Sequence, residues 1–96
     1  MRKSNDQSIK EVIGEIIESY KLKGRLDEVK LRNNWESLMG KAIANRTHSI
    51  GLKDGTLTIK ITSAPLGEEL FYASKKIKQL LNDELGEEVI KEVKII

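Results

Sequence analysis

The sequence has 96 residues, a mass of 10.9 kDa and a formal net charge of +2, with 39% apolar and 33% charged residues. A chain of this length forms one hydrophobic core, and its composition is that of a globular protein rather than a disordered one. The absence of cysteine excludes disulfides, thiolate metal sites and cysteine nucleophiles, and a single histidine leaves little for metal binding or acid–base catalysis.

The N-terminal residues are polar, and no apolar run approaches the roughly 18 residues that a membrane span needs. We therefore expect a cytoplasmic protein with no membrane contact, in which residues 1–7 form a flexible N-terminus and residues 8–96 form a single domain. Charge is uneven: residues 21–60 carry nine Lys or Arg and four Asp or Glu, whereas residues 61–96 carry five and seven. A basic middle suits a polyanionic partner, although solvated surfaces often show an excess of this size.

Two amphipathic helices are predicted before residue 45. Ser8 and Glu11 have capping-box spacing, and apolar residues then recur with a helical period over residues 8–21. Gly24 is expected to break this helix, and a second helix is predicted over residues 26–39, with Gly40 at its end or at a kink. Trp35 is in phase with the apolar residues of the second helix, so it is assigned to the core.

A β-hairpin follows, because apolar and polar residues alternate on both sides of Asp54-Gly55, a sequence typical of a type I′ turn. Such a turn fixes the register of the core face, pairing Leu52 with Leu57, Ile50 with Ile59 and His48 with Ile61. The other face is polar and mildly basic. We expect His48, the only imidazole, to be buried and neutral rather than catalytic.

The last third of the chain predicts a helix and a strand. Ser63 and Pro65 begin the helix, and Gly86 ends it near residue 85. The β-branched segment from Val89 to Ile96 forms the last strand. The predicted fold is α+β with the order α-α-β-β-α-β, a three-stranded sheet with one face covered by helices.

No pattern of catalytic or ligand-binding residues emerges from the sequence. It contains no phosphate-binding glycine loop, dinucleotide fingerprint or EF-hand loop. Its carboxylates occur mainly as sequence neighbours, which diverge on a helix instead of converging on one atom. We therefore predict a non-enzymatic protein with no catalytic residues, metal site, cofactor or small-molecule substrate.

Two sets of residues are candidates for binding surfaces. The first lies near the expected connection between the first two helices and the entry to the hairpin, and we assign it to nucleic-acid binding: Lys21, Lys23, Arg25, Lys41 and Arg46. The second lies off the apolar stripe of the last helix, and we assign it to a protein partner: Phe71, Tyr72, Lys75, Lys76 and Lys78. Because aromatic rings beside lysines also suit single-stranded nucleic acid, the second set is an alternative nucleic-acid site. The simpler alternative is that Phe71 fills the core edge and the lysines are solvated.

Several segments, in this order and spacing, resemble the DciA family of bacteria. They are the run Trp35–Ala44, the Thr47-His48 pair, the hairpin Leu52–Ile59, and the closing helix from Glu69 to Gly86. The resemblance covers nearly all of the chain from Ile9 and implies a KH-like α+β fold. It also implies a replication accessory protein that assists loading or operation of the replicative DNA helicase and has affinity for DNA. Because the positive charge is modest, we expect its binding to single-stranded DNA to be weak.

The sequence departs from this comparison in two respects. It has no GXXG loop, with which KH domains clamp nucleic acid, and it ends at Ile96, before the extension that larger family members carry. We therefore expect weak binding or a different mode of action. Two alternatives remain open: an RNA-binding KH-like module in translation or ribosome maturation, and a protein-interaction module without nucleic-acid function.

Overall fold

The computed structural model describes residues 8–96, so the flexible segment predicted for residues 1–7 lies outside the described residues. The described chain forms five helices and one three-stranded sheet. In chain order the elements are α1 (Ile9–Asn33), α2 (Trp35–Met39), α3 (Lys41–Asn45), β1 (Thr47–Lys53), β2 (Thr56–Ile61), α4 (Ala64–Tyr72), α5 (Ser74–Leu85) and β3 (Glu92–Ile95).

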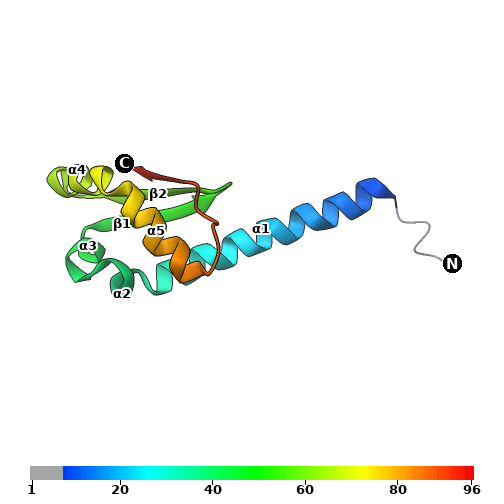
Figure 1. Ribbon diagram of the computed structural model, residues 1–96, viewed down its shortest axis with the longest axis horizontal. Helices are drawn as coiled ribbons and strands as arrows, with labels where there is room; N and C mark the ends of the chain where they lie inside the picture. Colours follow the sequence, from blue (N-terminus) through cyan, green and yellow to red (C-terminus); the bar gives the residue numbers. More distant parts are fainter. Residues whose placement is uncertain (1–7) are drawn as a thin grey trace.

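The sheet has the order β1-β2-β3, with β1 antiparallel and β3 parallel to the central strand β2. The predicted α+β class with a three-stranded sheet is therefore confirmed, and the element order matches approximately, with more helices than expected. The molecule measures 61 × 21 × 20 Å because the N-terminal half of α1 projects from the rest, which we call the body (residues 23–96) (Figure 1).

The core lies between the helices and one face of the sheet. Leu31, Leu57, Ile59, Leu81 and Ile90 are fully buried. Trp35, assigned to the core from its helical phase, is 6% exposed, which confirms that prediction. The remaining buried apolar residues come from β1, α4 and α5: Ile50, Leu70 and Ile77.

Helix α1 is continuous through Gly24, so the predicted break there is wrong. A glycine in a helix interior costs only about 1 kcal/mol relative to alanine. Packing of Leu31 in the core and the ion pair between Lys23 and Asp27, one turn apart across Gly24, offset this cost. The helix ends instead at Asn34, whose side-chain amide donates to the Lys30 carbonyl.

Two side chains of α1 bind the exposed edge of the sheet. One carboxylate oxygen of Glu28 accepts from the Leu52 N–H at 2.7 Å, and the other pairs with Arg32 at 2.8 Å. Arg32 also donates to the Ile50 carbonyl at 3.3 Å. Because β1 is an edge strand, these bonds satisfy backbone groups that no other strand within residues 8–96 pairs with, and they fix α1 to the sheet.

The hairpin forms at the predicted turn, where Asp54 and Gly55 both have positive φ values, 51° and 82°. The pairs of Leu52 with Leu57 and Ile50 with Ile59 are confirmed.

The predicted pairing of His48 with Ile61 is wrong, because a bulge between Thr47 and Ser49 places Thr47 opposite Ile61. The extra residue, His48, is exposed rather than buried on the core face. The Thr47 hydroxyl holds this arrangement in place, accepting from Trp35 Nε1 at 3.0 Å and donating to the Ile43 carbonyl at 2.8 Å.

The predicted last helix is two helices in the structure. Ser63 caps α4 as expected, and its hydroxyl accepts from the Leu66 N–H. At Ala73 the chain changes direction, and α5 runs at an angle to α4 (Figure 1). No glycine or proline marks this position. The change of direction allows Leu70 of α4 and Ile77 of α5 to enter the same core.

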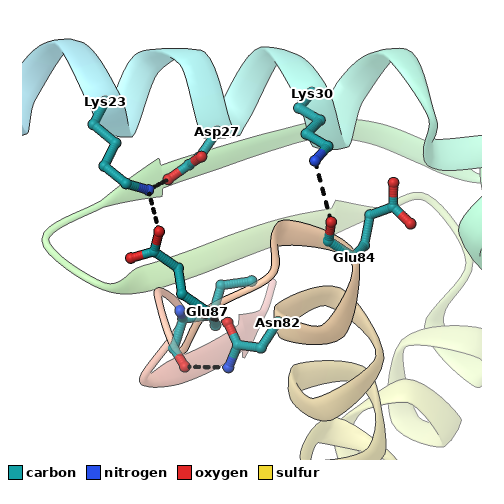
Figure 2. Close-up of polar contacts among 7 residues, drawn as sticks. Lys23, Asp27, Lys30, Asn82, Glu84 and Glu87 are labelled. Atoms are coloured by element: carbon teal, nitrogen blue, oxygen red, sulfur yellow. Dashed lines mark hydrogen bonds and ion pairs between the residues drawn. The ribbon is translucent and has the colours of Figure 1, made fainter.

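The return from α5 to β3 depends on Asn82, which is 8% exposed. Its amide nitrogen donates to the Ile90 carbonyl at 2.9 Å, and its amide oxygen accepts from the Ile90 N–H at 2.8 Å (Figure 2). The Gly55 carbonyl at the hairpin turn then accepts from the N–H groups of Lys91 and Glu92, where β3 begins. The strand is shorter than predicted because residues 89–91 form this connection.

We predict that Asn82→Ala lowers the free energy of unfolding by about 2–4 kcal/mol, because it leaves a buried N–H and a buried carbonyl of Ile90 without partners. Urea denaturation followed by the fluorescence of Trp35, the only tryptophan, measures this change. Gln79→Ala is the matched control, since it removes an exposed amide–carboxylate bond of the same helix and should cost less than about 0.5 kcal/mol. Equal effects of the two substitutions would contradict the role given to Asn82.

Candidate functional site

The first predicted set of basic residues does not form one cluster. Lys21, Lys23 and Arg25 lie in the middle of α1, whereas Lys41 and Arg46 lie at the two ends of α3. Because α1 continues to Asn33, the connection that was expected near Gly24 does not exist. Eight further residues of helix, about 12 Å, separate Arg25 from the end of α1, and α2 follows before α3 begins.

Part of the charge in this set is paired within the chain. Lys23 lies 2.8 Å from Asp27 and 3.2 Å from Glu87, so it joins α1 to the segment after α5 (Figure 2). The hydrogen bond to Asp27 raises the pKa of Lys23, desolvation opposes it, and the bond to Glu87 adds to the increase. Because the folded-state pKa is raised, this contribution to stability is present at neutral pH and is lost only as the pH rises through that raised value, above the ordinary 10.5. Lys21 lies 3.7 Å from Glu18.

The second predicted set contains an exposed aromatic pair. Phe71 and Tyr72 are 62% and 77% exposed, and their rings meet edge to face with centroids 5.5 Å apart. Lys75 and Lys76 are exposed in the first turn of α5, directly after this pair. The structure therefore brings four of the five predicted residues together, and Phe71 does not fill the core edge. We call Phe71, Tyr72, Lys75 and Lys76 the aromatic surface.

Lys78, the fifth residue of this set, is half-buried and lines a hollow with residues at the end of α5 and after it, including Asp83 and Glu87. The prediction that Lys78 lies beside Phe71 and Lys75 assumed one straight helix. Because the chain changes direction at Ala73, the helical spacing from Phe71 to Lys78 is interrupted.

An apolar hollow of about 490 Å³ adjoins the aromatic surface. Phe71 forms part of its lining, together with Ile61 of β2, Gly67 of α4 and the two C-terminal isoleucines, Ile95 and Ile96. A hollow of this composition accepts an apolar side chain and offers few groups that recognise a charged or polar ligand.

The second face of the sheet carries a basic patch, of which the sequence pattern predicted only a part. Lys53 and Lys60 come from the hairpin, as its mildly basic face predicted, and both are exposed. The parallel pairing of β3 adds Lys94 opposite Thr58, with Glu92 beside it. Lys94 can be assigned to this face only when the strand that pairs with β3 is known, and nothing in the sequence specifies that strand.

The tryptophan and threonine that carry the family resemblance are hydrogen-bonded to each other in the structure. The Trp35 indole N–H and the Thr47 hydroxyl form the bond that joins α2 to the start of β1. Gly40, with φ 91°, ends α2 and allows α3 to begin one residue later. This part of the motif therefore shapes the fold and exposes no reactive group.

The family model for DciA, described as Dna[CI] antecedent, matches residues 8–95. The match covers nearly the whole sequence, so the chain belongs to the DciA family. Its role accordingly relates to the loading of the bacterial replicative helicase, and the family is one of helicase adaptors rather than known catalysts.

Two other comparisons give no further match. Neither a curated protein nor a solved structure matches the chain, so the KH-like comparison stays a prediction. Within residues 8–96, none of the helices combines the length and the apolar character that crossing a membrane requires.

We predict that Thr47→Val lowers the free energy of unfolding by about 1–3 kcal/mol, because it leaves the buried Trp35 indole N–H without its partner and removes the hydroxyl bond to the Ile43 carbonyl, which keeps only its bond from the Arg46 N–H. Thermal or urea unfolding measures the change. Thr47→Ser keeps the hydroxyl and should recover most of the loss. Equal destabilisation by both substitutions would show that the methyl group, and not the hydroxyl, matters at this position.

Proposed function

We propose that the chain is a non-enzymatic adaptor that contacts the replicative helicase and binds single-stranded DNA weakly, with the aromatic surface as the DNA contact. Family membership supports the helicase-related role. The observation that supports the DNA contact is the exposure of two adjacent aromatic rings next to two unpaired lysine ammonium groups, with no ion pair found for either lysine among the described residues.

This combination matches the chemistry of single-stranded nucleic acid. Every base presents a flat face that can stack on an exposed ring, and each stacked base contributes about 1–3 kcal/mol. Tyr72 is the more accessible of the two rings, and Lys75 and Lys76 follow it in the first turn of α5, where they can neutralise flanking phosphates.

The charge of the surface limits its affinity. Glu68 and Glu69, exposed on α4, precede the aromatic pair and partly offset the two lysines. Two phosphate contacts to a single strand give a salt slope of only about 1.4, because each contributes about 0.7. We therefore propose micromolar or weaker binding that declines as salt increases.

The apolar hollow beside Phe71 supports a second role for the same region, contact with a protein partner. Phe71 and Ile96 are large exposed apolar residues at its margin, 62% and 60% exposed. In this arrangement Tyr72 and the lysines contact DNA, and Phe71 with the hollow contacts the helicase. A protein-interaction module that binds no nucleic acid is the alternative function that this observation favours.

We predict that Tyr72→Ala weakens binding to labelled oligo-dT by about 5- to 150-fold, the equivalent of losing one stacked base. Lys75→Glu with Lys76→Glu should nearly abolish binding. Fluorescence anisotropy at about 50 mM salt, where phosphate contacts are strongest, measures both effects.

The matched control is Lys21→Glu with Arg25→Glu, which makes the same charge change in the first predicted set and should alter binding much less. If this control weakened binding more than the substitutions in the aromatic surface, the DNA site would lie on α1 instead. Lys60→Glu with Lys94→Glu tests the open face of the sheet in the same way. Tighter binding of matched oligo-rU would favour the RNA-binding alternative, and no binding to either strand would leave the protein-interaction module.

Phe71→Ala separates the two proposed contacts. It should weaken co-purification with the replicative helicase and reduce oligo-dT affinity less than Tyr72→Ala does. If Phe71→Ala leaves helicase binding unchanged, the hollow is not the helicase contact.

A further inference from the structure

The projecting half of α1 carries an apolar stripe on which no other part of residues 8–96 packs. Every described residue from 8 to 22 is exposed, although the sequence has the pattern of a helix with one buried face (Figure 1). The stripe repeats at intervals of three and four residues and consists of Ile9, Val12, Ile13, Ile16, Ile17 and Tyr20. Their exposed fractions range from 41% for Val12 to 79% for Ile9.

The same face of α1 is covered farther along the helix. By helical spacing, Asp27 and Leu31 lie on the same face as Ile13 and Tyr20. Asp27 accepts a hydrogen bond from Lys23, and Leu31 is fully buried in the core. The stripe therefore continues a packing surface beyond the end of the body. An apolar face of this extent on a soluble helix marks a protein contact.

We propose that a second copy of this chain covers the stripe, with the two α1 helices packed antiparallel about a two-fold axis between residues 14 and 15. In this register Ile9 meets the partner's Tyr20, and Ile13 meets the partner's Ile16. The apolar pattern is therefore self-complementary, as a two-fold interface requires.

The flanking positions are compatible with this register. Val12 lies beside the partner's Ser19, and Ile17 lies beside the aliphatic stem of the partner's Lys10, so no like charges face each other there. Glu11 and Glu18 lie on the opposite side of the helix, by its 100° periodicity. The antiparallel orientation also pairs opposite helix dipoles.

A parallel pair is excluded by the position of the body. The body covers the same face of α1 from Lys23 onward, so two parallel helices joined along their stripes would bring both bodies into the same space. In the antiparallel pair the two bodies lie at opposite ends of the contact.

The area of the stripe is compatible with a dimer. From their exposed fractions the six residues present at most roughly 700 Å² per chain, so a dimer that covered them completely would bury up to about 1,400 Å² in total, in the lower part of the range of stable interfaces of about 1,200–2,000 Å². A hollow beside Tyr20 also supports this register at the two ends of the helix pair. Tyr20 lines an apolar hollow of about 350 Å³ with Leu52, Gly55 and Val89. The partner's Ile9, opposite Tyr20, reaches this hollow.

Sedimentation equilibrium of the full chain over a concentration series tests the dimer, and it requires neither DNA nor helicase. We expect a monomer–dimer equilibrium for the unchanged protein. Ile13→Glu with Ile16→Glu should raise the dissociation constant by about 100-fold or more, because the introduced carboxylates of the two copies would face one another. Leu22→Glu with Leu26→Glu is the matched control, since both leucines are exposed on α1 but lie off the stripe, and it should leave the dissociation constant within about threefold.

Two further measurements keep the outcome interpretable. Unchanged amide chemical shifts for the hairpin residues 47–61 show that each variant remains folded. Because the chain has no cysteine, Ile9→Cys and Tyr20→Cys chains can be mixed and oxidised, and the antiparallel register predicts mixed disulfide dimers in excess over both symmetric dimers. A monomer at all concentrations up to about 1 mM, a dimer that survives the stripe substitutions, or an excess of symmetric disulfides would each overturn the proposal.

Discussion

The two hydrogen bonds between the Asn82 side chain and the backbone of Ile90 are the constraint on which the sheet depends. A strand that follows a helix can join the sheet in parallel only if the chain turns back along it, and on this return Ile90 is fully buried, where unpaired backbone groups are costly. Asn82 satisfies both groups of Ile90 at once. The Gly55 carbonyl then accepts hydrogen bonds from the backbone at the start of β3, and these bonds join the hairpin turn to the last strand.

The attachment of α1 to the edge of the sheet determines the shape of the molecule and what it presents to partners. Glu28 and Arg32 bind backbone groups of β1, and Lys23 reaches Glu87 across the connection to β3. These polar contacts hold the C-terminal half of a 25-residue helix, so the other half extends as a continuous rod rather than folding back. The apolar stripe therefore lies in the projecting half of α1, and the aromatic surface lies away from it, at the junction of α4 and α5 (Figure 1).

The local elements were predictable because their signals are local. The Asp54-Gly55 turn has a backbone conformation that few other residue pairs adopt, and the alternation beside it sets the register by steric pattern alone. The helix caps at Ser8 and Ser63 and the burial of Trp35 likewise follow from neighbours within one or two turns. Of the candidate sites, the aromatic surface was predictable because its members are adjacent in the sequence.

The sequence by itself thus determined the fold class, the hairpin and the sequence motifs that resemble the DciA family, whereas the tertiary structure decided how distant residues meet. Gly24 stays helical because the burial of Leu31 and the ion pair of Lys23 with Asp27 outweigh its intrinsic cost, and the pattern around Gly24 does not reveal that Leu31 is buried. His48 is exposed because Trp35 holds Thr47 and forces a bulge, an effect of a side chain 12 residues away. The basic residues of α1 and α3 are separated, and Lys94 joins Lys60 on the open face, because the continuity of one helix and the parallel pairing of β3 are properties of the whole fold.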